Sequence, residues 1–232
     1  MYYVMSDIHG EYDKFLEMLD KIKLQDEDTL YILGNVVDYG DEPMELLNEM
    51  ADRPNVYPVI GNHDRIAIDV LTLLMDDILQ GKLDKLSAET MKSIAQWQKI
   101  GGTKTLEEFI KLTDEEKQDI LDYLCDFSNF EVVEIDGKTY ILVHSGLGDF
   151  EKNGKKLKYY SVHDLAFTRV DYEKQYFDDD SIFIVSGHVP TKELCGEDRI
   201  YKSHNNICIN CSVSDGGKLA CLCLDTMEEF YV

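Results

Sequence analysis

Five short motifs place Asp, Asn and His side chains directly after strand-like stretches of the chain. They are SDIHG (residues 6–10), GNVVDYG (34–40), GNHD (61–64), VHSG (143–146) and SGHVP (186–190). In an α/β sheet the loops after the strands converge at one edge, and ligands bind there. Carboxylate and amide oxygens combined with imidazole nitrogens suit Mn²⁺, Fe or Zn²⁺ better than Ca²⁺. The motifs therefore predict one shared site for divalent metal ions.

Each motif has a plainer explanation when it is taken alone. An Asp-X-His segment is often a turn with a capping role, and a Gly-His segment often carries a buried core histidine. Asn62 could simply supply a left-handed turn. The order of five such motifs, each after an apolar run, favours the shared site, and four of the six histidines fall within them.

The elements that must position these residues alternate between strands and helices. Apolar runs at 2–6, 30–33, 56–60, 140–143, 182–186, 207–211 and 219–224 predict short strands. Amphipathic patterns near 12–19 and 44–50 predict helices between the first three strands. This alternation predicts a layered α/β sandwich.

The middle of the chain lacks strand signals and is predicted to be helical. Between Arg65 and Phe127, Ser87 begins one helical segment, and Thr113 begins another with Glu116 three residues later, as in a capping box. We expect a helical insertion at about 65–128 within a single domain spanning 1–232. The hydrophilic stretch EKNGKKLKYY (151–160) is predicted to be a surface loop.

Charge and composition exclude several classes of protein. The chain carries a formal net charge of −23 and shows no basic stripe, which argues against binding to nucleic acid. No apolar run approaches the ~20 residues that cross a bilayer, and the first residues lack a signal sequence, so we expect a cytoplasmic protein with no membrane partner. Its six cysteines are interpreted as buried free thiols, with a structural zinc at Cys208 and Cys211 as the alternative.

Taken in order, the five motifs resemble the signature of the calcineurin-like metallophosphoesterases. That signature is Asp-X-His, Gly-Asp-X-X-Asp, Gly-Asn-His-Asp/Glu, a histidine after a strand, and Gly-His. The bacterial serine/threonine phosphatase-like branch, related to diadenosine tetraphosphatases, is the most similar. The likeness extends to the segments DIHGEYDKFLEML, WQKIGGTKTLEEF, FTRVDY, GHVPT and INCSVSDGGKLACLCLD. The resemblance implies two packed sheets flanked by helices and a centre of two divalent metal ions.

The resemblance also implies a role for each matching residue. The implied metal ligands are Asp7 and His9 at the first ion, Asn62, His144 and His188 at the second, and Asn35 bridging both. His63 would be the acid beside the leaving group, and Asp38 would orient it. Such a pair of ions can clamp a phosphate and activate a water for in-line attack.

Two residues of the motifs depart from the family pattern, two arginines are candidate substrate ligands, and Asn210 also differs from the relatives. Asn35 replaces a bridging aspartate, so we expect a weaker first metal site and reduced activity. Tyr39 replaces an arginine that grips phosphate, and it offers only one hydrogen bond. Arg169 and Arg65 are candidate phosphate ligands; the alternatives are a surface arginine and an ion-pair partner at a helix start. Asn210 stands where relatives usually carry aspartate, and we assign it no metal role.

Three functions are compatible with these residues. The first is a phosphomonoesterase acting on a phosphorylated protein, at phosphoserine or phosphothreonine, or on a small phosphoester. The second is a dinucleoside polyphosphate hydrolase, in which Trp97 and the segment GGTKTLEEF would wall a base; core packing is the simpler role for Trp97. The third is a non-catalytic protein that binds metal or phosphate.

Overall fold

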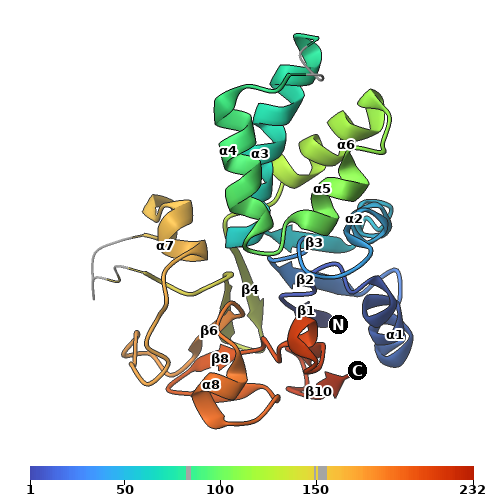
Figure 1. The fold of residues 1–232 in the computed structure, drawn as a ribbon. Coiled ribbons are helices and arrows are strands. Elements are labelled where there is room, and N and C mark those ends of the chain that lie inside the picture. The colour runs from blue at the N-terminus through green and yellow to red at the C-terminus, as the bar shows by residue number, and fades with distance from the viewer. Residues whose placement is uncertain (82–84, 149, 151–155) are drawn as a thin grey trace.

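Two five-stranded sheets pack against each other in the computed structural model, which describes residues 1–81, 85–148, 150 and 156–232 (Figure 1). The first sheet has the order β10-β9-β1-β2-β3. Its strands are β1 (Tyr2–Met5), β2 (Thr29–Leu33), β3 (Val56–Val59), β9 (Ala220–Cys223) and β10 (Glu229–Tyr231). The second sheet has the order β4-β5-β6-β8-β7. Its strands are β4 (Glu131–Ile135), β5 (Lys138–Leu142), β6 (Ile182–Ser186), β7 (Tyr201–Ser203) and β8 (Asn206–Cys208).

Helices cover the sheets and form a separate lobe. The helices are α1 (Tyr12–Ile22), α2 (Pro43–Ala51), α3 (Asn62–Leu79), α4 (Ala88–Gln98), α5 (Thr103–Phe109), α6 (Asp114–Cys125), α7 (Val162–Ala166) and α8 (Thr191–Cys195), with 3₁₀ turns η1 (Leu157–Tyr159) and η2 (Val213–Asp215). Helices α3 to α6 lie between β3 and β4 in the chain and rise above the sheets in Figure 1. The α/β sandwich with a helical insertion is the predicted fold.

The alternation of side chains along the strands builds two separate apolar layers. Val4 lies between the sheets with Leu142 and Val185 of the second sheet, whereas the neighbouring Tyr3 and Met5 pack under the helices. In β9, Cys221 and Cys223 share the helix side and Leu222 faces the other sheet. The two cysteines therefore share one face of the strand, as side chains two residues apart do.

The parallel strands bring the predicted site residues to one edge of the molecule. Strands β1, β2 and β3 pair in parallel, as do β5, β6 and β8. The residues that follow their carboxyl ends are therefore neighbours in space, although they are far apart in the chain. These residues include Asp7, Asn35, Asn62, His144, His188 and Asn210.

Several details correct or complete the sequence-based expectations. Strand β6 matches its prediction, but the strand expected at 207–211 ends at Cys208, and β4, β7 and β10 were not predicted. The caps at Ser87 and Thr113 are present, and Thr113 and Glu116 form the expected capping box. Residues 151–155 of the expected surface loop lie outside the described residues, and the loop's end forms η1.

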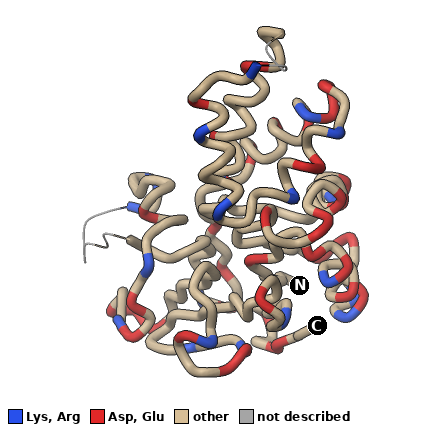
Figure 2. The backbone as a smooth tube through the Cα atoms, in the orientation of Figure 1, with Lys and Arg blue, Asp and Glu red and all other residues tan. Residues whose placement is uncertain are grey.

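The structure also shows how the cysteines and the acidic residues are distributed. All six cysteines are free; four are buried, while Cys125 is exposed and Cys195 half-buried, so the expectation of burial is wrong for these two. Acidic residues occur on every part of the tube in Figure 2. Among the described residues, no helix has both the length and the apolar character that a membrane span requires.

Candidate functional site

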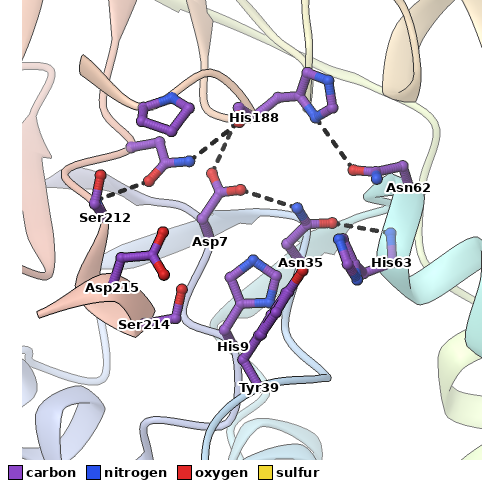
Figure 3. Close-up of a pocket in the computed structure, with 12 residues that line it drawn as sticks. Asp7, His9, Asn35, Tyr39, Asn62, His63, His188, Ser212, Ser214 and Asp215 are labelled. Carbon is purple, nitrogen blue, oxygen red and sulfur yellow. Dashed lines mark hydrogen bonds between the residues drawn. The ribbon is translucent and has the colours of Figure 1, made fainter. Parts of the chain in front are cut away.

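Seven of the residues singled out in the sequence line one pocket at the shared strand edge (Figure 3). They are Asp7, His9, Asn35, Tyr39, Asn62, His63 and His188. His144 lies directly behind the wall of this pocket, because its Nε2 is 2.9 Å from the Asn62 side-chain oxygen. The side chains of five separated motifs therefore meet in one place.

Unusual backbone conformations aim these side chains into the pocket. Six site residues have a φ between 51° and 75°, in the left-handed region, namely Asp7, His9, Asn35, Asp38, Tyr39 and His188. Residues other than glycine seldom adopt this region, and where they do, functional sites are over-represented. Beside Asn35, a Cβ on Gly34 would lie 2.4 Å from the Gly61 nitrogen. Only glycine lets the loops after β2 and β3 approach this closely.

The first group of three donors, Asn62, His144 and His188, which we call the amide–imidazole set, presents converging lone pairs. His144 Nδ1 lies 2.7 Å from the Leu33 carbonyl, which can only accept, so this nitrogen carries the proton. Burial lowers the pKa of His144 to about 4, so the ring is neutral at pH 7 and Nε2 has a lone pair. That lone pair faces the Asn62 oxygen at 2.9 Å, and His188 Nδ1 lies 3.2 Å from the same oxygen.

The second group, Asp7, His9 and Asn35, which we call the carboxylate set, is closed by internal hydrogen bonds. The Asn35 amide donates from Nδ2 to Asp7 Oδ1 at 2.9 Å, and its oxygen accepts the His63 backbone N–H at 3.0 Å. Asp7 Oδ2 accepts the His188 backbone N–H at 2.9 Å. His9 Nδ1 donates to the Val37 carbonyl at 2.9 Å, which leaves its Nε2 free, and burial lowers the pKa of His9 to about 4.

These two sets fit a metal ion to different degrees. In the amide–imidazole set an acceptor faces an acceptor, an arrangement that is repulsive unless a cation or a donor lies between them. Rotation of the Asn62 amide would supply an N–H, whereas a bound cation would hold the oxygen where it is. In the carboxylate set, Asn35 directs an N–H group at Asp7, where an aspartate would direct an oxygen. The residues therefore fit one ion at Asn62, His144 and His188, and fit a second at Asp7 and His9 poorly.

The amide oxygens are essential to any ion site here. Across residues 1–81, 85–148, 150 and 156–232, no group of three or more His, Cys, Asp or Glu side chains is placed to hold an ion. Each set contains an asparagine in place of a third charged or imidazole ligand. Metal binding in this pocket thus depends on neutral amides, which are weaker ligands than carboxylates.

His63 and Asp38 form a hydrogen-bonded pair at the side of the pocket. His63 Nδ1 lies 2.8 Å from Asp38 Oδ2. Asp38 is fully buried, and it also accepts hydrogen bonds from Trp97 Nε1 at 3.0 Å and from the Thr105 hydroxyl at 3.0 Å. These contacts fix the carboxylate, which in turn fixes the imidazole ring. Trp97 is 1% exposed, so its role is to pack and to hold Asp38.

Asp64, the last residue of the GNHD motif, points away from the pocket and holds two loops together. Its buried carboxylate accepts backbone N–H groups from Gly61 (2.8 Å), Asn35 (2.7 Å), Val36 (2.9 Å) and Val37 (3.4 Å). Burial raises its pKa to about 6, while these four donors act in the opposite direction. Asp64 thus joins the loop that carries Asn35 to the start of α3, which carries Asn62 and His63.

The three expected substrate ligands occupy different surroundings. Tyr39 lines the pocket, and its ring contacts the His9 ring at a centroid distance of 5.0 Å. Arg65 is paired with Asp69 on the exposed side of α3, at 2.6 Å, and does not line the pocket. Arg169 is paired with Glu193 at 2.5 Å and lines a neighbouring hollow with Phe150, Lys174 and Tyr176.

Five lining residues were not assigned to the site from the sequence. They are Pro190, Asn210, Ser212, Ser214 and Asp215. Asn210 holds the loops: its Nδ2 donates to the His188 carbonyl at 3.2 Å, and its oxygen accepts the Ser212 N–H at 2.9 Å. Pro190 ends the SGHVP motif, and the signal that could have found Ser212, Ser214 and Asp215 is the polar, glycine-rich stretch SVSDGG (212–217), which follows β8 at the same edge of the sheet.

Comparisons with known proteins agree with this architecture. A curated symmetrical bis(5'-nucleosyl)-tetraphosphatase of Buchnera aphidicola is 33% identical over 100 residues, which are 41% of this chain and 36% of that protein. The corresponding enzyme of Nitrosospira multiformis is 24% identical over 147 residues, or 62% and 43% of the two chains. The chain thus spans less than half the length of either relative.

Solved structures resemble this one over nearly its whole length. A candidate diadenosine tetraphosphatase superposes with a TM-score of 0.64 at 15% identity, covering 100% of this chain and 92% of that chain. A serine/threonine phosphatase from Saccharomyces cerevisiae gives 0.60 at 13% identity, covering 100% and 79%. At these identities the likeness establishes the fold. The calcineurin-like phosphoesterase family matches residues 2–215, and the chain belongs to that family.

Proposed function

We propose that this chain is a metal-dependent phosphomonoesterase that hydrolyses phosphoserine, phosphothreonine or small phosphate esters. Its family is one of phosphoesterases that use divalent metals. The observation that carries the proposal is the meeting of two neutral lone pairs, one on Asn62 in the pocket wall and one on His144 directly behind it, near the His63–Asp38 pair at the side of the pocket. Cation ligands beside a held imidazole are what hydrolysis of a phosphoester requires.

The metal ligands in this proposal follow the two donor sets. Asn62, His144 and His188 would hold one divalent ion, and Asp7 and His9, with Asn35 at the bridging position, would hold a second one weakly. Mixed oxygen and imidazole donors suit manganese, iron or zinc. When bound, such ions supply a water of lowered pKa and polarise the phosphoryl oxygens.

The residues of the chain supply the proton and the orientation. His63 donates its Nδ1 proton to Asp38, so its Nε2 faces the pocket and can carry the proton for the leaving oxygen. Asp38 keeps the ring in this tautomer, because Trp97 and Thr105 hold the carboxylate. We assign His63 as the general acid and Asp38 as the residue that positions it.

A second candidate is hydrolysis of dinucleoside polyphosphates, because the curated relatives are named for that activity. One argument for it is wrong: Trp97 cannot form a wall against a base, because its ring is buried and its N–H is bonded to Asp38. The lining of the pocket also lacks arginine and lysine among the described residues, whereas a polyphosphate carries several negative charges. These observations favour the monoester.

The placement of the arginines bears on how substrate would be held. Arg169 lines the hollow next to the pocket, and its ion pair with Glu193 is exposed, so a substrate phosphate could replace Glu193. Arg65 is a weaker candidate, since it is paired along α3.

The six free cysteines suit a reducing compartment, and we include a cytoplasmic location in the proposal.

The test is hydrolysis of p-nitrophenyl phosphate with added Mn²⁺, measured for the unaltered protein and for Asn35→Asp. We expect slow turnover for the first and a gain of about tenfold or more for the second, because a carboxylate can bridge two ions. His63→Asn should lose most of the activity and keep its metal. Equal, negligible rates in both proteins at full metal occupancy would contradict the proposal and favour a non-catalytic binding protein.

A further inference from the structure

The charge of the pocket is unusual for a site that receives phosphate. Its described lining residues include the carboxylates Asp7 and Asp215 and no lysine or arginine. Asp7 has both oxygens bonded, to the Asn35 amide and the His188 N–H. Asp215 makes no ion pair within the described parts of the chain, and its carboxylate points into the pocket (Figure 3). An unpaired negative charge therefore faces whatever is attached to the phosphoryl group.

The loop that carries Asp215 is tied to the rest of the site. Ser212, in the left-handed region, donates its N–H to Asn210, and Asn210 donates to the His188 carbonyl. The Asp215 N–H donates to the Ser212 carbonyl at 2.9 Å. These bonds fix the position of Asp215 relative to His188. The backbone that carries this carboxylate is thus held in place at the edge of the pocket.

Tyr39 provides a second wall of the same pocket. It keeps a strained φ of 64°, which a bulky residue adopts rarely. Its N–H donates to the Gly101 carbonyl at 3.0 Å, and its ring lies so close to Gly101 that a Cβ there would be 2.9 Å away. The side chain is nonetheless 49% exposed. The backbone strain therefore serves to present an aromatic ring to the pocket.

Asp215 and Tyr39 line the same pocket. A carboxylate attracts a cation by its charge, and an aromatic ring attracts a cation within about 6 Å of its centre. The same carboxylate repels an anionic leaving group such as a polyphosphate.

We propose that this pocket selects phosphoesters whose leaving group carries a cation, an ammonium or a guanidinium, received by Asp215 and Tyr39. The inference rests on the proposed phosphomonoesterase function and names its class of substrate. The phosphoryl group would lie toward Asn62 and His188, and the cationic group toward the SVSDGG loop. Asp215 determines specificity and takes no part in the transfer of the proton.

Binding measured without turnover tests the inference directly. Isothermal titration of the protein with 2-aminoethylphosphonate and with n-propylphosphonate, in Mn²⁺ at pH 7.5, compares two ligands of one size that differ by one ammonium group. We expect the amino ligand to bind about fivefold more tightly or better, the effect of one charge pair near the surface. The preference should shrink in 0.5 M NaCl, because salt screens the pair. Equal affinities would overturn the inference.

Variants distinguish the effect of Asp215 from that of the overall negative charge of the chain. Asp215→Asn should reduce the preference to less than about twofold, and Asp215→Lys should reverse it. Asp119→Asn, which removes one exposed carboxylate from α6 in the helical lobe, is the matched control and should keep the full preference. A preference that survives Asp215→Asn, or that Asp119→Asn also abolishes, would overturn the assignment to Asp215.

Turnover measurements show whether the cation belongs to a small molecule or to a peptide. They also test the phosphomonoesterase proposal separately from the inference about the cation. The substrates are phosphoethanolamine and two phosphothreonine peptides, one with flanking arginines and one with flanking alanines. Their rates show whether the better substrate is an ester of a small amino alcohol or a basic peptide. Faster hydrolysis of either cationic ester supports the inference. Equal hydrolysis of charged and neutral esters would overturn the inference and leave the phosphomonoesterase intact. Faster hydrolysis of diadenosine tetraphosphate than of any monoester would overturn both. If the phosphonates show the charge preference but no ester is hydrolysed, even by Asn35→Asp, the phosphomonoesterase fails and the pocket remains a binding site for cationic phosphoesters.

Discussion

The two donor sets of the pocket are built from the same kinds of residue and differ in what their hydrogen bonds leave free. In the amide–imidazole set, the Leu33 carbonyl takes the His144 Nδ1 proton and leaves the lone pair of Nε2 beside Asn62. In the carboxylate set, Asn35 places an N–H group against Asp7, so the two side chains satisfy each other. The difference shows the effect of having an amide nitrogen where an aspartate would have an oxygen. At Asn35 this nitrogen forms an internal hydrogen bond with Asp7 instead of presenting a lone pair.

The largest expected effect is on the pH dependence of stability. It arises because the buried histidines of both donor sets stay unprotonated in the folded protein. Burial lowers the pKa values of His144 and His188 in one set, and of His9 in the other, to about 4 from 6.5. Below pH 6.5 the unfolded chain binds three protons that the folded chain refuses until about pH 4. Asp64 has a raised pKa of about 6 and offsets one of them. The metal-free protein should therefore lose about 2 kcal/mol of unfolding free energy per pH unit as the pH falls from 6 to 4.

Urea unfolding with chelator, at several pH values between 4 and 6.5, checks this slope. The variant His144→Asn should reduce it by about half, because one of the two net protons is removed. A stability that is flat over this range, or that rises as the pH falls, would contradict the neutral, buried state of the imidazoles.

The next effect concerns metal affinity and separates the sets. His144→Ala should weaken the tightest Mn²⁺ binding by about a hundredfold, because it removes a ligand with a fixed lone pair. His9→Ala should weaken that same step by less than about tenfold, since His9 belongs to the poorer set. Calorimetric titration of both variants with Mn²⁺ gives the loss of affinity that each one causes. Equal losses would show that the sets do not differ as the hydrogen bonds indicate.

A smaller effect concerns Asp64, which both sets share through the loop of Asn35 and the start of α3. Asp64→Asn replaces one acceptor oxygen by an NH₂ group that faces two backbone N–H donors. We expect a loss of about 2 kcal/mol in unfolding free energy and weaker binding at both sets. Asp69→Asn, which breaks only the exposed pair with Arg65, should cost less than about 0.5 kcal/mol. Chemical denaturation of the two variants makes the comparison, and similar costs would contradict the role of Asp64.

The smallest effect concerns the support behind His63. Trp97→Phe keeps one aromatic ring but removes the N–H that Asp38 accepts, which should cost about threefold in kcat, and the smaller buried ring leaves a cavity that should cost about 2 kcal/mol of stability. Tyr123→Phe in the same lobe removes a hydroxyl that has no partner among the described residues, and should change neither quantity. Thermal unfolding and phosphatase assays report both. An unchanged Trp97→Phe would show that Thr105 alone suffices to hold Asp38.

Much of this architecture could be predicted from local patterns, because the central strands are apolar and end in polar turns. The three strands that were missed, β4, β7 and β10, all lie at sheet edges. Their side chains are mostly half-buried or exposed, and charged residues such as Glu131, Lys202 and Glu229 interrupt the apolar pattern. An edge strand pairs on one side only, so its sequence need not be apolar.

The motifs named seven of the residues that line the pocket, but they did not indicate the hydrogen-bond partners of these residues. Trp97 and Thr105 lie 59 and 67 residues from Asp38, and no local pattern links them to it. Asp64 has the type of a metal ligand, yet its carboxylate turns toward four backbone N–H groups. Which way a side chain points depends on backbone geometry that only the assembled loops define.

The central claim is that the pocket holds a divalent ion chiefly through Asn62, His144 and His188. Crystals of the unaltered protein, soaked in Mn²⁺ and measured near the manganese absorption edge, test it most directly. The account predicts a strong anomalous peak in contact with His144 Nε2 and His188 Nδ1, and a weaker peak beside Asp7 and His9. No peak in the pocket, or a stronger one at Asp7 and His9, would contradict it.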